Sequence, residues 1–314
     1  MKNYIYSILL LLLAFSTIGT SQQLALQSQF MVNKFTINPA FAGTQKGIPI
    51  HLGVRRQWSA IKEAPAQQYL SANMALGGGL GAGVNVYNEV AGPTRRTGLS
   101  LTGAYQFSLA KNGENNHQIS LGLSGQLNQH VLDKKKLETY LPDDPTIAAA
   151  YNNQLLPDVS FGAYYHNANK YYLALSVMNL LQTKTDIFNL SNYVRNNYVR
   201  NYYLMAGYNI EISDDITIQP NVLVQGIEAL PMQFDINTRL LYKQQYWFGA
   251  SYRHQDAIVG MFGMNYAGME FSYSYDMTIS NIKTYSNGSH ELHIIYRIVQ
   301  QNGLKSNRKG NKYF

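Results

Sequence analysis

Residues 70–86 read LSANMALGGGLGAGVNV and carry one pattern on both sides of three glycines. Apolar residues stand at positions 70, 72, 74 and 76, and again at 80, 82, 84 and 86. Successive side chains of a β-strand point to opposite faces, so this period of two predicts strands with one apolar face. The glycines between them favour a tight turn. The stretch therefore predicts an antiparallel hairpin.

The same period of two runs through the rest of the chain. About fourteen segments show it, and they are 48–54, 70–76, 80–86, 99–107, 119–127, 159–165, 171–177, 202–210, 216–224, 232–240, 246–252, 258–264, 269–275 and 292–298. Each predicted strand is about ten residues long, which is the length that a tilted strand needs to cross a bilayer.

The links between these segments distinguish a membrane barrel from a soluble β-sandwich, whose strands also alternate. Every second link is generally short, as at 77–79, 166–169, 213–215, 242–245 and 266–268. Several of the others are long, at 130–156, 181–197 and 277–288. Short turns on one side and long loops on the other are typical of bacterial outer-membrane barrels, whose long loops are extracellular. We predict an all-β fold, a transmembrane antiparallel β-barrel of about fourteen strands, although the link near Gln255 is short for an outside loop and 111–116 is long for a periplasmic turn.

Aromatic residues near the ends of the predicted strands suit the two membrane interfaces, because they have an apolar body and a polar tip. They are Trp58, Tyr105, Phe107, Tyr165, Tyr171, Tyr202, Tyr246 and Tyr275. Tyrosine is also a good strand former. We interpret these rings as girdles that contact outer-membrane lipid.

The composition of the 314 residues agrees with this class and excludes several others. Apolar residues make up 46% and charged residues 14%, which excludes a disordered chain. After residue 21 no run approaches the roughly 18 apolar residues of a membrane-spanning helix. The absence of cysteine excludes disulfides, thiol nucleophiles and cysteine zinc sites. The mean hydropathy of −0.22 fits strands that alternate between lipid and a polar lumen.

The two ends of the chain differ from the rest. Residues 1–21 have Lys2, an apolar run at 8–15 and small residues before Gln22, the pattern of a secretory signal peptide. The tail at 305–314 has four basic residues and no acid, so only about +2 of the net charge of +7 belongs to the region between. Nucleic acid is therefore not expected as a partner of this exported chain.

Four short motifs, in this order and spacing, resemble the PorP/SprF family of outer-membrane proteins of the type IX secretion system in Bacteroidetes. They are Asn38-Pro39-Ala40-Phe41-Ala42-Gly43, Arg55-Arg56-Gln57-Trp58, Tyr273-Ser274-Tyr275-Asp276 and Gly288-Ser289-His290-Glu291-Leu292. The resemblance covers essentially the whole mature chain. Phe41 stands where the family pattern has tyrosine, and the basic tail is an extension that the pattern does not include.

The resemblance implies a role in the secretion or surface attachment of particular cargo proteins, such as gliding-motility adhesins that carry a type IX C-terminal signal. It also implies the type IX translocon and its periplasmic ring as partners. We accordingly divide the chain into a signal peptide (1–21), a periplasmic N-terminal segment or plug (22–46), the outer-membrane barrel (47–300) and a basic periplasmic tail (301–314).

The parity of the strands predicts one polar cluster. If Leu52 and Val54 face lipid, Arg55 and Gln57 face the lumen, and the same count turns Asp276 and Glu291 inward. The first and last strands of a barrel pair, so these groups should lie together in the extracellular half of that seam. They would form either a salt bridge that satisfies buried charge or a contact for cargo or a loop.

No catalytic, cofactor or metal site is expected. Ser289 and His290 are neighbours on a strand and point to opposite faces, so they do not form a nucleophile and base. His51, His254 and His293 could meet in the lumen, but their spacing does not indicate a metal, and solvated lumenal histidines are expected. Gly77–Gly83 lacks the lysine and helix of a phosphate loop. Asp143 and Asp144 with Glu138 fit a solvated loop better than a calcium site.

Two other functions stay open. A diffusion porin would have a wide, charged lumen, and a hydrophobic-solute transporter would have an apolar passage with residues 22–46 as a plug. Cargo handling predicts a plugged barrel whose outside loops, 131–156 and 181–197, contact a secreted protein.

Overall fold

The computed structural model describes residues 27–109, 117–138, 144–167, 170–185, 196–197, 199–227 and 230–298. The predicted signal peptide and the basic tail lie outside these residues, as do Asp143 and most of the predicted loop 181–197. Among the helices of the described ranges, none has the length and apolar character that crossing a membrane requires.

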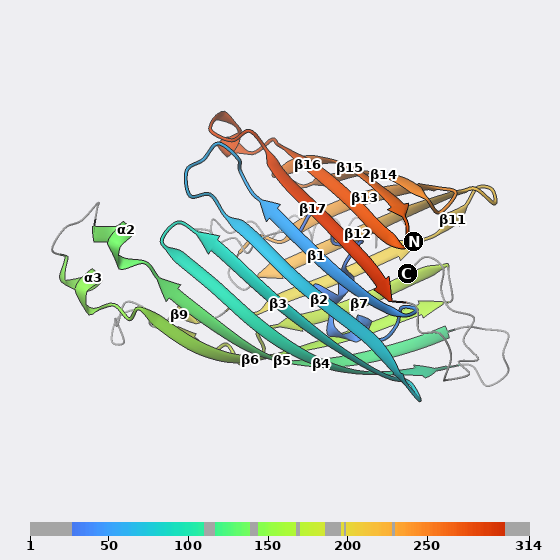
Figure 1. The fold of residues 1–314 in the computed structure, drawn as a ribbon, viewed down its shortest axis with the longest axis horizontal. Coiled ribbons are helices and arrows are strands. Elements are labelled where there is room, and N and C mark those ends of the chain that lie inside the picture. The colour runs from blue at the N-terminus through green and yellow to red at the C-terminus, as the bar shows by residue number, and fades with distance from the viewer. Residues whose placement is uncertain are drawn as a thin grey trace, which may run out of the picture.

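Fourteen strands of the described residues form one closed antiparallel barrel (Figure 1), as predicted. They are β1 (Ile48–Arg56), β2 (Ala66–Gly77), β3 (Leu80–Ala91), β4 (Thr94–Ser108), β5 (His117–Leu132), β6 (Asn153–Asn167), β7 (Tyr171–Met178), β10 (Asn201–Tyr208), β12 (Ile216–Ile227), β13 (Gln233–Tyr242), β14 (Tyr246–Arg253), β15 (Ala257–Tyr266), β16 (Met269–Thr278) and β17 (Ser289–Ile298). Each pairs with its neighbours in the chain, and β1 pairs with β17 to close the barrel, Ile48 opposite Ile298 and Arg55 opposite Glu291. The strands therefore match the fourteen alternating segments one for one.

The shorter elements lie between or inside these strands. They are β8 (Lys184–Thr185), β9 (Asn196–Asn197), β11 (Ile210–Glu211), α2 (Lys134–Glu138), α3 (Pro145–Ala149) and the 3-10 turns η1 (Lys34–Thr36), η2 (Pro39–Phe41) and η3 (Asn281–Thr284). The connections 57–65 and 279–288, and the described parts 133–138 and 144–152 of a third, lie at one end of the barrel, and tight turns such as 78–79, 243–245 and 267–268 lie at the other. Long loops mark the extracellular end. The link between β3 and β4 lies at this end too, but it is short. It consists of Gly92 and Pro93, because β3 ends at Ala91 and β4 begins at Thr94.

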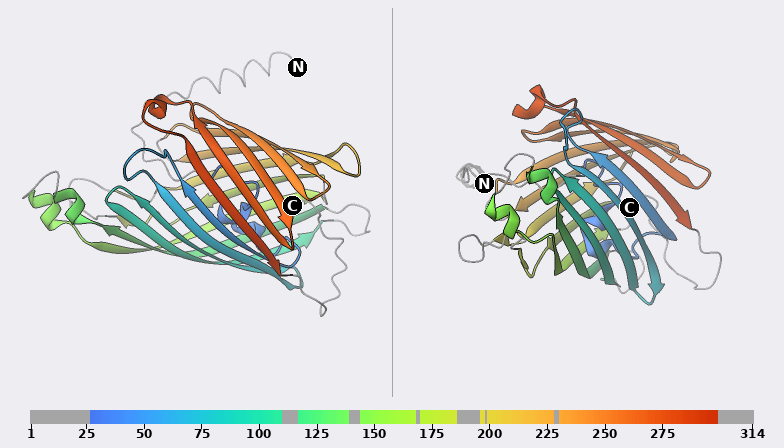
Figure 2. Two further views of the ribbon diagram at one scale, coloured as in Figure 1. Left: turned by 45° about the horizontal axis from the view of Figure 1, so that its top comes forward. Right: turned by 60° about the vertical axis from the view of Figure 1, so that its left-hand side comes forward.

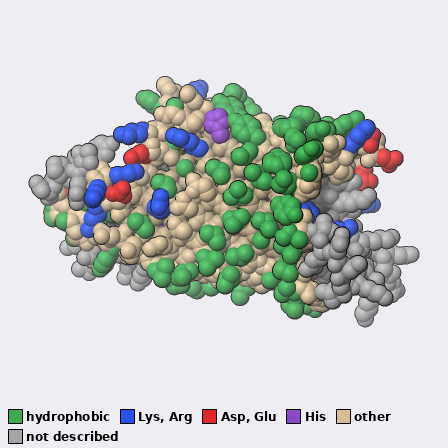
Figure 3. Space-filling view, viewed as in Figure 1, with side chains coloured by type: hydrophobic (Ala, Val, Ile, Leu, Met, Phe, Trp, Pro, Cys, Tyr) green, Lys and Arg blue, Asp and Glu red, His purple; other side chains and the backbone are tan. Residues whose placement is uncertain are grey.

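The alternation along the strands separates a lipid face from a lumenal face. Leu52 and Val54 are 43% and 41% exposed, whereas His51 and Arg55, which flank this pair in the sequence, are 2% and 3% exposed. Hydrophobic side chains are spread over the strands on the outer surface (Figure 3). Trp58 differs from the expectation, because it stands half-buried in the loop after β1 with a φ of 48° and is not part of a strand.

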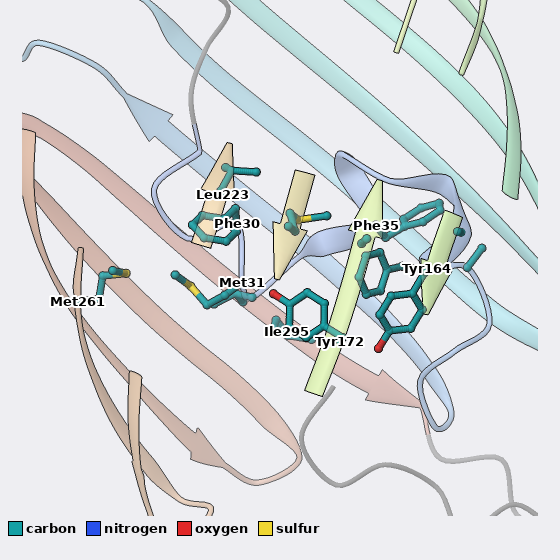
Figure 4. Close-up of a cluster of buried hydrophobic side chains, with 14 of the residues drawn as sticks. Phe30, Met31, Phe35, Tyr164, Tyr172, Leu223, Met261 and Ile295 are labelled. Carbon is teal, nitrogen blue, oxygen red and sulfur yellow. The ribbon is translucent and has the colours of Figure 1, made fainter. Parts of the chain in front are cut away.

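The hydrophobic core lies inside the barrel rather than between two layers. Residues 27–46, which we call the lumenal segment, run through the lumen (Figure 2, blue) and are buried from 28 to 35 and from 38 to 43. Phe30, Met31 and Phe35 of this segment pack against Tyr172, Leu223 and other wall residues (Figure 4). The polar wall thus encloses an apolar centre that the chain itself supplies.

Candidate functional site

The lumenal segment runs from the extracellular half of the lumen to the periplasmic end. Ser28 contacts residues near the extracellular ends of β1, β16 and β17. At the other end, Gly47 lies against the carbonyl of Ile298, the last residue of β17, just before β1 begins at Ile48. The segment therefore descends the lumen before the chain enters the barrel wall.

The motif Asn38–Gly43 fixes the lower part of the segment to the wall. Asn38 Oδ1 accepts a hydrogen bond from Ala40 N at 2.9 Å, which caps η2, and Pro39 occupies the first position of that turn. Asn38 Nδ2 donates to the carbonyls of Ala163 at 3.3 Å and Leu175 at 2.9 Å. One asparagine thus orders the turn and binds it to β6 and β7.

The wall has glycine where this motif lies against it. A Cβ atom at Gly122 of β5 would overlap Pro39 and Ala40, one at Gly162 of β6 would overlap Asn38, and one at Gly81 of β3 would overlap the carbonyl of Ala42. Gly43 itself has a φ of +73° and approaches Gly81 closely. Backbone packs on backbone here, which only glycine permits.

We expect Asn38→Ala to lower the free energy of unfolding by about 1–2 kcal/mol, because it removes a cap and leaves two carbonyls without their donor. Urea unfolding of the purified barrel measures this. Asn88→Ala is the control, since that amide hydrogen-bonds Gln68 on the exposed surface. Equal losses in the two variants would contradict the prediction.

The predicted seam groups Arg55, Asp276 and Glu291 lie together in the lumen. Arg55 Nη2 is 2.7 Å from Asp276 Oδ2, and Arg55 Nη1 is 2.9 Å from Glu291 Oε2. All three side chains are at most 3% exposed. They come from β1, β16 and β17, which are adjacent because the barrel closes between β1 and β17.

Three further residues extend this group, and the sequence reasoning missed them. Arg253 Nη1 lies 3.3 Å from Asp276 Oδ2 and 3.2 Å from Asp256 Oδ2, and Arg253 Nε lies 3.2 Å from Asp235 Oδ2. The alternation along β14 turns position 253 into the lumen, and this pattern could have identified Arg253. We call Arg55, Arg253, Asp235, Asp256, Asp276 and Glu291 the ionic cluster.

The lumenal segment is bound to the ionic cluster by its backbone and by one hydroxyl. The amides of Ser28 and Gln29 donate to the two carboxylate oxygens of Glu291 at 2.8 and 3.2 Å. Ser28 Oγ donates to Asp276 at 2.6 Å and accepts from both guanidinium groups of the cluster at 2.9 Å. In the contacts described, four carboxylates face two guanidinium groups, so the segment supplies donors that an acid-rich cluster needs.

The other predicted residues lie beside the cluster without joining it. The backbone N–H of Gln57 donates to the carbonyl of Pro65 at 2.9 Å, and the backbone N–H of Trp58 donates to Ser289 Oγ at 3.1 Å. Gly288 has a φ of +81°, and its carbonyl accepts from Ser59 N at 2.7 Å. These contacts join the loop 57–65 to the start of β17.

His290 points outward, where its ring lies 2.7 Å from the hydroxyl of Tyr273, while Ser289 is buried inside. The two therefore lie on opposite faces, as predicted.

His51 and His293 are buried, but His254 is exposed in the turn after β14, so the three histidines do not converge. Asp144 caps α3 through Thr146 N at 2.7 Å. The described residues contain no group of His, Asp and Glu arranged to hold a metal ion.

Lys34 of the lumenal segment lies over the ring of Tyr172, with Nζ 4.5 Å from its centroid. Burial, together with the positive charge of Arg239, lowers the pKa of Lys34 from 10.5 to about 7. At a pH between these two pKa values, the Lys34 side chain is protonated in the unfolded chain and neutral in the folded barrel. The free energy of unfolding should therefore rise with pH in this window, by at most about 1.4 kcal/mol per pH unit from this group.

We expect Lys34→Met to remove this rise in stability between about pH 7 and pH 10, as measured by urea unfolding. Lys46→Met, at the exposed last residue of the segment, should keep it. An unchanged slope in the Lys34 variant would count against the role of Lys34.

A closed fourteen-stranded barrel with an apolar outer face and a polar, ion-paired lumen defines a bacterial outer-membrane β-barrel protein. Solved structures share this architecture at low identity. The toluene transporter TbuX of Ralstonia pickettii has 8% identity and a TM-score of 0.48, with 90% of this chain and 96% of that chain covered. The outer-membrane protein Omp33 of Acinetobacter baumannii has 8% identity and a TM-score of 0.44, with 82% and 100% covered.

The family follows from the sequence. The family model described as type IX secretion system membrane protein PorP/SprF matches residues 19–296, and the chain belongs to this family. It is thus an outer-membrane component associated with the type IX secretion machinery, and the family is not one of enzymes. Comparison with curated proteins gives no match.

Proposed function

We propose that this barrel is a closed component that handles secreted cargo at the extracellular side of the outer membrane, and that the lumenal segment is its plug. One observation carries the proposal: the segment is held at both ends, by the ionic cluster around Ser28 and by the glycine positions around Asn38–Gly43. A diffusion porin needs an open lumen, and a segment held at both ends would close it.

The cargo in this proposal is a large surface protein with a type IX C-terminal signal, of the kind that gliding adhesins represent. The translocon and its periplasmic ring would deliver it. The loops 57–65 and 279–288, with the described residues 133–138 and 144–152, lie at the extracellular end and would offer the contact surface.

Deletion of the gene tests the proposal directly. We expect one or a few large proteins to disappear from the cell surface by surface proteomics, with return on complementation. Unchanged surface proteins together with altered solute uptake would favour a porin or a hydrophobic-solute transporter instead. Reconstituted wild-type barrel should conduct ions poorly in planar bilayers, and a large steady conductance would contradict a plugged lumen.

A further inference from the structure

A cavity of about 150 Å³ lies above the lumenal segment, in the extracellular half of the lumen. Its walls come from β2, β3, β4 and β5 on one side and from β7, β10 and β12 on the other. Phe30, Phe35, Ile37 and Pro39 of the lumenal segment form its floor. We call this cavity the vestibule. Because the segment closes it below, a ligand reaches it from the extracellular end.

The vestibule has almost no charge, in contrast to the ionic cluster. Of the described residues that line it, Glu89 is the only one with a formally charged side chain. The rest of its polar lining consists of amides and hydroxyls, such as Gln126, Thr102 and Tyr203. Such a lining matches an uncharged ligand that both donates and accepts hydrogen bonds.

Four buried amide atoms of this lining have no hydrogen-bond partner among the described residues. They are Gln67 Oε1, Asn85 Oδ1, Asn201 Oδ1 and Asn128 Nδ2. Asn128 and Asn201 are each only 1% exposed. Buried polar groups are generally paired, and leaving one unpaired costs free energy. All four residues line the vestibule, so its wall is rich in amide groups that suit a polar ligand.

The same lumen already binds polypeptide backbone through wall side chains. Asn73 Oδ1 accepts from Gly43 N at 3.1 Å, Ser176 Oγ donates to the carbonyl of Ile37 at 2.5 Å, and Glu291 accepts from two backbone amides of the segment. The vestibule continues this wall above the segment with neutral amides. A peptide bond offers one donor and one acceptor, which is what those amides match.

We propose that the vestibule binds an uncharged stretch of the cargo polypeptide. The desolvated and nearly uncharged wall of the vestibule disfavours charged side chains. This inference rests on the proposed function, because it takes the secreted cargo as the ligand.

Photocrosslinking in intact cells tests the proposal. In one variant benzoylphenylalanine replaces Tyr203, which lines the vestibule. In the control it replaces Tyr202, the preceding residue of β10, which is 43% exposed on the outer face. We expect position 203, and not 202, to crosslink to a peptide of a protein that the deletion strain loses from its surface. Mass spectrometry should place the crosslink in an uncharged stretch.

A second variant tests the amide chemistry. Asn85→Leu removes an unpaired acceptor of the vestibule, and Val84→Leu is the matched control on the outer face of β3. We expect the yield at position 203 to fall about fivefold or more with Asn85→Leu, the factor that one lost hydrogen bond of about 1 kcal/mol gives. Val84→Leu should leave the yield unchanged. Both should keep the heat-resistant electrophoretic migration of a folded barrel.

Several results would overturn the inference. A crosslink at 203 to carbohydrate alone would assign the vestibule to a neutral glycan, and equal crosslinks at 202 and 203 would show no selective binding. No crosslink at 203, in cells whose deletion strain still loses surface proteins, would reject the vestibule and leave the proposed function standing. Surface proteins that are unaffected by deletion would reject both.

Discussion

Arg55→Met is expected to lower the free energy of unfolding of the barrel by about 3–5 kcal/mol, the cost of leaving buried charge uncompensated. Arg55 bridges Asp276 at 2.7 Å and Glu291 at 2.9 Å, and it also donates to Ser28 Oγ. Without Arg55, Arg253 is the one guanidinium group left, among the contacts described, to compensate the carboxylates of the cluster. The seam and the anchored end of the lumenal segment should weaken together.

Urea unfolding in detergent or lipid measures this loss, with Arg56→Met as the control because Arg56 is the exposed neighbour on the same strand. The double variant Arg55→Met with Glu291→Gln should recover part of the stability, since it removes one uncompensated charge. A single variant as stable as the Arg56 control would mean that the ion pairs contribute nothing measurable.

Gly122→Val is expected to displace the lumenal segment and raise the ion conductance of the reconstituted barrel well above that of the wild type. A side chain at this inward position would overlap the backbone of Pro39 and Ala40. Overpacking of this kind costs about 1–3 kcal/mol, less than unfolding the barrel, so the segment should move while the strands remain paired. Planar-bilayer recordings measure the conductance.

Gly125→Val is the matched control, because Gly125 is exposed on the outer face of the same strand and a Cβ there meets nothing within 4 Å. It should conduct as poorly as the wild type. If Gly122→Val stays closed and folded, the lumen is blocked by something other than the seating of Asn38–Gly43. If both variants conduct, the effect belongs to β5 and not to the plug.

Some features of the barrel could be predicted because they depend only on neighbouring residues. The period of two is a local property of a strand, so residues 48–54 and 269–275 could be recognised one segment at a time. Parity then placed Arg55, Asp276 and Glu291 on the lumenal side, and closure of the barrel put their strands side by side. The same count was available for Arg253, but Asp256 lies in a turn, where parity does not apply.

Other features depend on contacts across the lumen. That a backbone lies against Gly81, Gly122 and Gly162 cannot be read from strands whose glycines also occur on the outer face, as at Gly125. His254 is a different case, because it follows the inward-facing Arg253 by one residue and therefore has the outward parity, and it stands in the exposed turn after β14.

The sequence by itself determined the outer-membrane barrel, its fourteen strands and their lipid and lumenal faces, because alternation and link length are properties of neighbouring residues. Only the tertiary structure decided that residues 27–46 run through the lumen between the ionic cluster and the glycine positions, with a neutral vestibule above. The physical reason is that the lumen is enclosed by strands far apart in the chain, and what meets inside it depends on how the whole barrel closes.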